Sequence, residues 1–452
     1  MTTGPHPTAR ILHLSALPVW PLEGKGGMPS LRETLRGHVA AGHHVTLVLP
    51  QYQLFELHPR PVSVRQDEGY DVHLAPCRWI PGLLALRRAA RRLGGGKDVP
   101  FAPRWVLNLL TFLLLTCSLV AVGLRLRYRT RRRFDLVYAH NQYAALAGWI
   151  LGRIFRVPNV TRLYGTFLAD LMTRPLVWLR YPVAAAGYLV PHSLLICCND
   201  GTRGDEVARR LGIDLGRFRF WQNGVDMPAL PPDGTRESYA RTAPGNLRLG
   251  SLWAVCCSRL SYWKRTDRIL RALKVARDAG ADCQLLVAGD GAERPRLEDI
   301  AASLGLEADV VWLGALAHDD IWRLMHLADV FVIANDVTNR CNPLYEAICA
   351  GLPVVSVVDP STADLLKHRE NALLADKDEG EAMGRSLAEF CRDPSLRAKL
   401  GQAQRPVARR LWNWEERLRV EVADLEELVR SSRAGGNSRS PSKPVRTASS
   451  CR

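Results

Sequence analysis

Short apolar runs alternate with helix-length amphipathic segments along most of this 452-residue chain. Strands buried on both faces of a parallel sheet read as continuous apolar runs, and a helix joins each to the next. The pattern therefore predicts two successive doubly wound α/β domains. The expected strands cover residues 10–15, 44–49, 134–140, 159–163, 194–198 and 218–222 in the first domain, and 254–258, 284–288, 310–314, 330–334 and 353–357 in the second.

Breaks in this pattern indicate the domain limits. The Pro- and Gly-rich stretch at residues 228–246 is typical of a linker. We expect a first domain over residues 1–235, a second over 236–410, a closing amphipathic helix over 411–430 and a disordered basic tail over 431–452. The tail has too few apolar residues to form a core.

One segment departs from the amphipathic pattern. Residues 105–124 carry no charge, and six of the nine residues at 125–133 are Arg. Length and basic flank meet the minimum for a transmembrane helix. A single crossing, however, would place strands of one predicted sheet on opposite sides of the bilayer. Two alternatives stay open, a sheet-covering helix buried on most of its surface and a helix lying in the membrane interface. The arginines favour membrane contact.

The charge is unevenly distributed. The chain has 61 Lys and Arg against 45 Asp and Glu, a net charge of +16, of which residues 1–240 carry +14, residues 241–430 carry −3 and the last 22 residues carry +5. A basic first half predicts an anionic partner, which could be nucleic acid, a membrane surface or a phosphorylated substrate. We expect no nucleic acid, because aromatic residues are not interleaved with the basic ones as base stacking requires.

Composition excludes other classes of protein. With 47% apolar and 23% charged residues, the chain is neither broadly disordered, nor collagen-like, nor a polytopic membrane protein. Its eleven cysteines are odd in number, lack CxxC spacing and fall in apolar runs, which favours reduced thiols over disulfides or a zinc site. The first residues show no basic region followed by an apolar one, so we expect no secretory signal and a cytoplasmic location.

Polar residues suited to chemistry follow the predicted strands of the second domain, where open sheets bind ligands. Arg259 and Lys264 come after a strand and lead into a helix, and fixed cations beside a helix N-terminus suit a diphosphate. Gly289-Asp290-Gly291 predicts a tight turn where a ligand can approach the backbone. Glu346 lies on a helix that begins near Asn342-Pro343.

The order and spacing of these residues, together with Gly314 in VVWLGAL and the segment NPLYEAICAGLPVVSV, resemble the donor-binding domain of retaining GT-B glycosyltransferases of family 4, the glycosyl transferases group 1. The first domain is similar to that family in GKGGMPSLRETLRGHVAAGHHVTLVLP and in QNGVD at residues 222–226. RLWNWEERL resembles its closing helix. The resemblance covers about residues 10–430 and implies two Rossmann-like domains that face a central cleft, the first for the acceptor and the second for a nucleotide-sugar donor.

The resemblance also implies roles for single residues. Arg259 and Lys264 would hold the pyrophosphate and stabilise the departing nucleoside diphosphate, so that no metal or other cofactor is expected. Glu346 would accept hydrogen bonds from the ribose, and His140 would reach the sugar and phosphate. Transfer with retention would depend on positioning and charge stabilisation. The donor-binding residues implied in this way are Gly26, Gly27, Gly289, Gly291, Gly314, Asp336, Thr338, Asn342 and Pro343.

Three positions depart from the family pattern. The family has an acidic residue eight positions before the glutamate, whereas this chain has Thr338, with Asp336 nearby as a substitute. Its glycine-rich stretch is replaced by residues 339–342, and its His-Gly after the strand at 159–163 by Tyr164-Gly165. These positions bear on the donor sugar and the acceptor rather than on the fold.

We therefore expect a hexosyltransferase that moves a sugar from a nucleotide-sugar, UDP-linked in preference to GDP-linked, to a glycan or lipid-linked acceptor presented at a membrane, as in glycolipid or polysaccharide biosynthesis. It would be cytoplasmic and peripheral on the cytoplasmic face of an anionic membrane. The alternative is a catalytically degenerate GT-B subunit that binds a membrane or a partner protein. An epimerase or a phosphorylase fits QNGVD and the Arg259/Lys264 pair less well.

Overall fold

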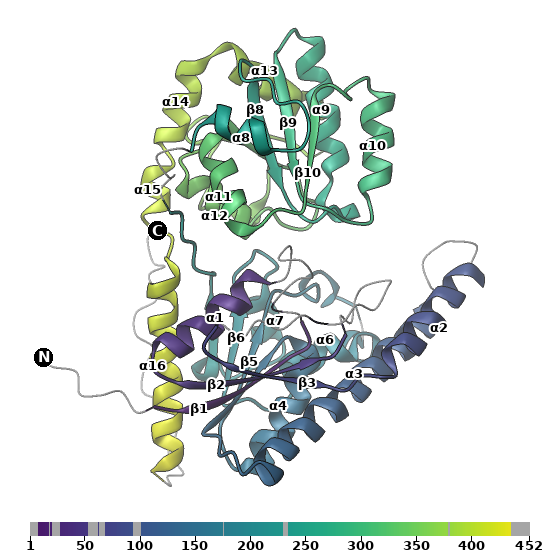
Figure 1. Cartoon of the computed structure of the whole chain (residues 1–452), viewed down its shortest axis with the longest axis vertical. Coiled ribbons are helices and arrows are strands. Elements are labelled where there is room, and N and C mark those ends of the chain that lie inside the picture. Colours follow the sequence, from purple (N-terminus) through teal and green to yellow (C-terminus); the bar gives the residue numbers. More distant parts are fainter. Residues whose placement is uncertain are drawn as a thin grey trace, which may run out of the picture. The chain divides into compact units, whose positions relative to one another are not determined.

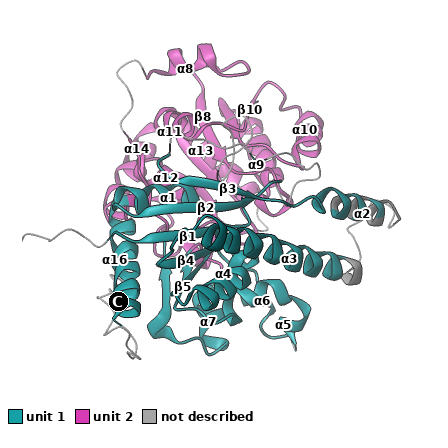
Figure 2. Ribbon diagram, turned by 60° about the horizontal axis from the view of Figure 1, so that its bottom comes forward, with its two compact units in different colours: residues 1–199, 203–222, 415–452 teal, residues 200–202, 223–414 magenta. Residues whose placement is uncertain are grey.

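The chain forms two compact units in this computed structural model, coloured separately in Figure 2. Gly26 and Gly27 lie outside the described residues, as does the tail from residue 435. Unit 1 comprises residues 1–199, 203–222 and 415–452, and unit 2 comprises residues 200–202 and 223–414. The structure describes residues 8–17, 19, 28–52, 62, 68–93, 101–174, 176–228, 234–377 and 380–434.

Unit 1 is built on a seven-stranded parallel sheet with the order β3-β2-β1-β4-β5-β6-β7. The strand order reverses between β1 and β4, and open sheets bind ligands at the carboxyl ends of strands beside such a switch point. The strands are β1 (Arg10–Ser15), β2 (His44–Pro50), β3 (Asp71–Ala75), β4 (Leu136–His140), β5 (Asn159–Leu163), β6 (Leu194–Cys198) and β7 (Phe218–Trp221).

Helices cover both faces of this sheet because side chains alternate along each strand. In β2, Val48 packs into one apolar cluster with residues of α3 and α4, whereas Leu47 and Leu49 pack into another with residues of α1. The helices are labelled in Figure 1, except α5, which is labelled in Figure 2. They are α1 (Pro29–Ala40), α2 (Ile80–Leu93), α3 (Phe101–Leu124), α4 (Gln142–Phe155), α5 (Val177–Arg180), α6 (Pro182–Leu189), α7 (Gly204–Arg210) and α16 (Trp414–Arg433).

The uncharged segment forms α3, which continues into a π-helical turn at Arg125–Arg129. By length and composition alone it could span a membrane, and only 28% of its most apolar window is buried. Of the two alternatives left open by the sequence, a helix buried on most of its surface does not fit this exposure. One face packs on the sheet through Leu115 and Leu119, and Phe112 packs against Tyr143 of α4. Since β3 before α3 and β4 after it belong to one sheet, the fold is incompatible with a single crossing.

Unit 2 is built on a six-stranded parallel sheet with the order β10-β9-β8-β11-β12-β13. Two apolar clusters cover its faces. In β9, Leu285 and Val287 pack into one with residues of α9 and α13, and Leu286 into the other with residues of α11 and α12. The strands are β8 (Leu252–Cys257), β9 (Cys283–Ala288), β10 (Val310–Gly314), β11 (Val330–Ile333), β12 (Val354–Val357) and β13 (Ala372–Ala375).

The described helices of unit 2 connect these strands and form its C-terminal part. Unit 2 carries α8 (Arg236–Thr242), α9 (Thr266–Asp278), α10 (Arg294–Ser303), α11 (His318–Leu327), α12 (Asn342–Cys349), α13 (Gly380–Arg392), α14 (Pro394–Gln402) and α15 (Arg405–Ala408). The stretch that composition indicates as a linker contains one of these helices, α8.

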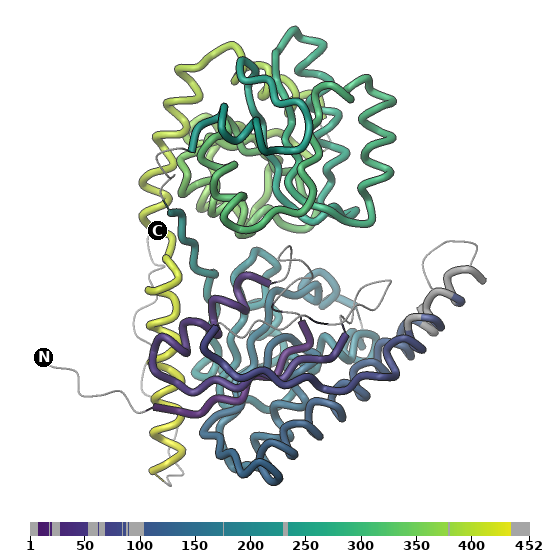
Figure 3. The backbone as a smooth tube through the Cα atoms, viewed as in Figure 1, coloured from purple at the N-terminus to yellow at the C-terminus, as the bar shows by residue number. Residues whose placement is uncertain are grey.

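The chain passes from unit 1 to unit 2 after Gln222 and returns after Trp414, as Figure 3 allows the reader to follow. The expected limits were 235 and 410. The QNGVD segment is fixed to the start of α16, which explains the difference. A Cβ at Gly224 would lie 2.7 Å from the backbone nitrogen of Trp414. The Trp414 N–H also donates to Asp226 over 3.1 Å.

Candidate functional site

Four of the positions singled out in the sequence gather at one edge of the unit 2 sheet. Because its strands are parallel, their carboxyl ends share an edge. Arg259 follows β8, Gly289 follows β9, Gly314 ends β10 and Asp336 follows β11. The Gly289 N–H donates to the Gly314 carbonyl over 2.7 Å, which joins two neighbouring loops. This edge is where an open α/β sheet binds its ligand.

Lys264 and Glu346 lie near the same strand end. Arg259 is exposed and Lys264 half-buried, with the Lys264 Nζ 4.1 Å from the centre of the Trp263 ring. Burial raises the pKa of the Cys257 thiol, and Glu346 raises it further while Lys264 lowers it. Both charges therefore act on the end of β8. The site can offer cations to a diphosphate and a carboxylate to hydroxyl groups.

Glu346 is held by a histidine that sequence reasoning missed. On α12, Pro343 occupies the first turn, a favoured position, and Glu346 is 6% exposed. Its Oε1 lies 2.9 Å from the Nε2 of His318, the first residue of α11, and the His318 ring packs on Trp322. The available signal was a polar ring at a helix start shortly after the strand end at Gly314. Glu346 is thus a buried acceptor with a fixed orientation.

Asp336 positions the turn that carries Lys264. Its carboxylate pairs with Arg265 over 3.2 Å and with Arg268 over 3.1 Å. Its backbone N–H donates to the Trp263 carbonyl over 3.0 Å. These contacts connect the end of β11 to the segment that follows β8. The carboxylate that was expected to replace a missing acid is therefore engaged by two arginines of unit 2.

The glycines of the turn after β9 have a reason within the chain. A Cβ at Gly289 would lie 1.8 Å from the Ser258 carbonyl oxygen, and one at Gly291 would lie 2.2 Å from that of Leu260. At Gly289 the φ of 145° also disfavours a side chain. The sequence suggested room for a ligand, whereas the structure shows that these glycines let the turn pack against the loop that carries Arg259.

The segment that replaces a glycine-rich stretch is locked by its own hydrogen bonds. The Thr338 hydroxyl donates to the Asp200 carbonyl over 2.9 Å and lies 2.9 Å from the Ser361 hydroxyl. The Asn342 side chain accepts from the Asn223 amide over 3.2 Å. Thr338 is buried, so its hydroxyl serves packing within unit 2.

In unit 1, His140 belongs to a buried chain of polar side chains. It is the last residue of β4, and its Nδ1 lies 2.8 Å from the Tyr164 hydroxyl. Its Nε2 lies 2.9 Å from the Nδ1 of His13. The His13 Nε2 is 3.3 Å from the Nδ1 of His38, whose Nε2 is 3.3 Å from Oε1 of Glu421. The row of hydrogen-bonded side chains thus extends from Tyr164 at a strand end to Glu421 on α16.

Glu421 is an ionised carboxylate in a fully buried position. Burial alone would raise its pKa, but Arg417 and Arg162 hold that pKa well below the usual range. Oε2 lies 2.9 Å from Arg417 and 3.3 Å from Arg162. Oε1 accepts a hydrogen bond from the Tyr138 hydroxyl over 2.7 Å. A buried charge needs such partners, and here β4, β5 and α16 provide them.

The charge of Glu421 sets the direction of the hydrogen bonds. An ionised carboxylate only accepts, so the facing nitrogen of His38 carries a proton. Burial lowers the pKa of His13 and of His140 well below the usual range, so both rings are neutral and each has one donor and one acceptor nitrogen. In the tautomer in which His38 accepts through Nδ1, each histidine carries its proton on Nε2 and Tyr164 donates to the Nδ1 of His140. The polar group at the outer end of this chain is the Tyr164 hydroxyl.

Of the side chains in this buried hydrogen-bonded row, only His140 was predicted as a site residue. The signals in the sequence were a histidine inside the apolar run at residues 10–15, the Tyr164-Gly165 replacement and a glutamate on the apolar side of the closing helix. Its members come from β1, α1, β4 and α16, with Tyr164 just after β5. Sequence spacing alone does not bring these elements together.

Comparison with known proteins agrees with this geometry. Residues 244–407 match the family model "Glycosyl transferases group 1". That range contains the residues described above at the carboxyl ends of the unit 2 strands.

Curated relatives include transferases with several acceptors. A GDP-mannose-dependent alpha-(1-6)-phosphatidylinositol monomannoside mannosyltransferase of Mycobacterium tuberculosis is 27% identical over 45% of this chain and 54% of its own length. A 2-deoxystreptamine glucosyltransferase of Streptomyces kanamyceticus is 25% identical over 70% of this chain and 84% of its own length. The match thus spans only about half of the mannosyltransferase.

Solved structures share the architecture over nearly the whole chain. Anabaena HepE in complex with UDP and glucose has a TM-score of 0.64 and 19% identity, and covers 93% of this chain and 99% of its own. Sucrose-phosphate synthase from Thermosynechococcus elongatus has a TM-score of 0.68 and 17% identity, with coverage of 94% and 100%. At such identities the likeness shows the fold alone, which is the two-domain α/β fold expected from the sequence.

Proposed function

Because this chain has the GT-B fold and a glycosyl transferases group 1 domain over residues 244–407, we propose that it is a retaining glycosyltransferase that moves a sugar from a nucleotide-sugar to a lipid-linked or membrane-presented acceptor. The observation that carries the proposal is the gathering of Arg259, Lys264 and Glu346 around one edge of the unit 2 sheet, inside the matched range.

In this proposal unit 2 binds the nucleotide diphosphate. Arg259 and Lys264 contact the pyrophosphate and stabilise the charge that develops as the sugar leaves. Glu346, oriented by His318, accepts hydrogen bonds from the ribose hydroxyls. The two cations supply the charge that a divalent metal supplies elsewhere, so a chelator is expected to leave the rate unchanged.

Unit 1 contributes the group that faces the transferred sugar. His140 was expected in that role, but it is buried, and its Nδ1 lies within hydrogen-bond distance of the Tyr164 hydroxyl. We therefore assign the contact with the ligand to the Tyr164 hydroxyl and give His140 the role of a positioning residue behind it.

The donor is proposed to be a UDP-sugar, with a GDP-sugar as the second choice. The HepE structure is described with UDP, whereas the mycobacterial relative is named GDP-mannose-dependent. The departures at Thr338 and Asn342 lie in the segment that contacts the donor hexose in the family, and therefore bear on the sugar rather than on the nucleotide.

A membrane-presented acceptor is supported by α3. Val106, Leu110, Leu113 and Leu114 on its outer face are 36–47% exposed, and arginines follow it directly. Apolar side chains beside cations suit the interface of an anionic membrane. The proposed location is the cytoplasmic face of such a membrane, and the relative that acts on phosphatidylinositol monomannoside agrees with a lipid-linked acceptor.

The second candidate is a catalytically degenerate subunit that binds a membrane or a partner protein. It is favoured by one observation. The position that is acidic in the family is Thr338, whose hydroxyl is used inside unit 2, while both carboxylate oxygens of nearby Asp336 face arginines.

A donor panel distinguishes the two candidates. Purified protein is incubated with UDP- and GDP-sugars and a detergent-solubilised lipid extract, and nucleotide release is measured. Lys264→Ala is expected to lower the rate about a hundredfold, the effect of removing a group that stabilises the transition state. Glu346→Gln is expected to lower the rate by weakening donor binding, because the ribose loses an ionised acceptor. Lys274→Ala, which removes a lysine paired with Asp278 on the surface of α9, is the control.

The site assignment is wrong if both variants keep the full rate. Absence of release with every donor, combined with unchanged vesicle binding, would favour the degenerate subunit instead.

A further inference from the structure

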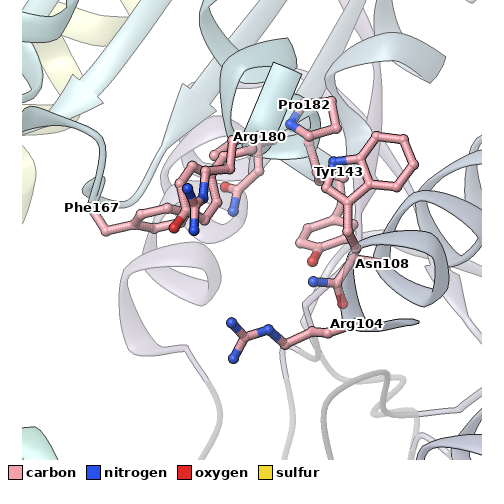
Figure 4. Close-up of a pocket in the computed structure, with 11 residues that line it drawn as sticks. Arg104, Asn108, Tyr143, Phe167, Arg180 and Pro182 are labelled. Atoms are coloured by element: carbon pink, nitrogen blue, oxygen red, sulfur yellow. The ribbon is translucent and has the colours of Figure 1, made fainter. Parts of the chain in front are cut away.

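Residues of unit 1 alone form a cavity apart from the proposed donor site. A cavity of about 130 Å³ lies among the first turns of α3, α4 and α6 and the loop after β5. In Figure 4, Phe167 and Arg180 lie on one side and Asn108 and Arg104 on another, with the ring of Tyr143 between them. The lining residues are Arg104, Trp105, Asn108, Gln142, Tyr143, Phe167, Arg180, Tyr181, Pro182, Val183 and Ala184.

The cavity is suited to an anion. It has two guanidinium groups, Arg104 and Arg180, and no Asp or Glu is among the described residues that line it. Both arginines are exposed, as groups at the mouth of a cavity are. Pro182 begins α6, and the free backbone N–H groups of the first turn add partial positive charge on the same side. Arginine is the side chain that best matches the geometry of phosphate oxygens.

The rest of the lining is aromatic and continues into an apolar surface. The Trp105 indole N–H donates to the Leu179 carbonyl over 3.0 Å, which fixes α3 to α5 beside the cavity. Phe167 and Tyr181 pack edge to face with ring centres 5.3 Å apart. Next to these residues, Val106 on α3 and Leu179 on α5 are 47% and 62% exposed. A ligand held by the arginines can therefore extend an apolar chain over α3 and α5.

The position of the cavity narrows the class of ligand. Its volume of about 130 Å³ is well above the space that one water needs, so a phosphate group has room there. Gln142 and Tyr143 lie two and three residues after His140, and Phe167 lies three residues after Tyr164. The cavity therefore lies beyond the carboxyl ends of β4 and β5.

We propose that this cavity binds the phosphate group of a membrane lipid, whose apolar chains lie along the exposed faces of α3 and α5. The proposal rests on the membrane contact proposed above and gives it a specific ligand. It would hold one lipid head group at the edge of the sheet where the sugar is transferred. The residues that bind it are Arg104 and Arg180 for the phosphate, with Trp105 and Phe167 against the first carbons of the chain.

Binding of a single amphiphile tests the site without any transfer reaction. Dodecyl phosphate, kept below the concentration at which it forms micelles, is titrated into the full chain and followed by calorimetry. Inorganic phosphate and dodecyl maltoside, which has the same chain and no charge, serve as comparisons. The expected result is saturable binding of dodecyl phosphate that is at least tenfold tighter than that of either comparison.

Single substitutions assign the binding to the cavity. Arg104→Gln and Arg180→Gln are each expected to weaken dodecyl phosphate about tenfold, the lower end of the effect of a hydrogen bond to a charged group. Both side chains are exposed, so neither substitution is expected to disturb the apolar core. Arg153→Gln, which removes an exposed arginine of α4 that does not line the cavity, is the matched control.

Three results would overturn the proposal. Inorganic phosphate could bind as tightly as dodecyl phosphate, which would indicate a site for free phosphate. Dodecyl maltoside could bind equally well, which would indicate an apolar surface without charge recognition. The two arginine variants could also behave as Arg153→Gln does. A protein without glycosyltransferase activity would contradict the function proposed above but would leave all these binding results unchanged.

Discussion

At the level of single side chains, the contact between His318 and Glu346 fixes the carboxylate that is proposed to bind the nucleotide. A carboxylate on a helix can rotate, but the His318 nitrogen 2.9 Å from Oε1 fixes one oxygen and leaves the other for a ligand. His318 is in turn packed on Trp322. The affinity for the nucleotide should therefore depend on a residue outside the glutamate motif.

The substitution His318→Ala is expected to raise the KM for the nucleotide-sugar about tenfold and to change kcat less, because Glu346 loses its orientation while the cations remain. Initial rates over a range of donor concentrations measure both constants. Arg323→Ala on the same helix is the control. A double variant with Glu346→Gln should be no worse than Glu346→Gln alone, and full additivity would argue against the coupling.

Among the elements, the layer between the unit 1 sheet and the helices α1 and α16 is unusual in being polar. His13, His38, Tyr138 and His140 lie there with ionised Glu421. Such a layer is stable only when every charge has a partner. The pKa directions of the buried histidines make its contribution to the free energy of unfolding depend on pH.

Unit 1 is expected to lose stability as the pH falls below about 6.5, the pKa of a histidine in an unfolded chain. Burial lowers the folded-state pKa of His13 and of His140, so below pH 6.5 the unfolded chain binds protons that the folded chain does not. Stability is therefore complete above pH 6.5 and falls by up to about 1.4 kcal/mol per pH unit for each histidine.

Urea unfolding at pH 7.5 and 5.5 measures this effect. His13→Gln should reduce the dependence on pH, whereas His326→Gln, which replaces a half-buried histidine of α11 in unit 2, should leave the pH dependence of unit 1 unchanged. A free energy of unfolding that stays constant or rises between pH 7.5 and 5.5 would show that these histidines are not kept neutral by burial.

Strands could be predicted from the sequence where a continuous apolar run marks them. Every strand expected from an apolar run is present, with ends shifted by no more than two residues. The two missed strands are at sheet edges. Half-exposed β3 reads DVHLA without a continuous apolar run, and β13 has only four residues. The polar layer was missed because it depends on α16, which is about 280 residues after His140 in the sequence, and no local pattern encodes that pairing.

At the scale of the whole molecule, the excess positive charge and the residues proposed to bind the nucleotide lie in different halves of the sequence. Residues 1–240 carry most of the positive charge, and the described part of α3 with its arginines lies in that half. The residues proposed to bind the nucleotide lie in the half with a slight negative charge. The positive charge therefore belongs to the proposed membrane face rather than to the donor site.

Exposed arginines after α3 are expected to contribute to binding of anionic vesicles. Arg132 pairs with Asp71 and is therefore left unchanged in the test, whereas Arg129, Arg131 and Arg133 are exposed. Replacing these three with Ser is expected to weaken binding by about 1 kcal/mol per charge, which is about a hundredfold in total. Sedimentation with vesicles at low and high salt measures it. Equal binding of the parent protein to neutral vesicles would contradict the electrostatic part of the proposal.

The placement of α3 between two strands of one sheet also bears on how acceptors are found. Both ends of the helix are tied to the same side of any bilayer, so the outer face of α3 can enter lipid only to a limited depth. Under the membrane contact proposed here, the protein would move laterally over the surface and meet acceptors in two dimensions. It would also pass from one vesicle to another without unfolding, so sugar transfer in a mixture should spread to vesicles added later.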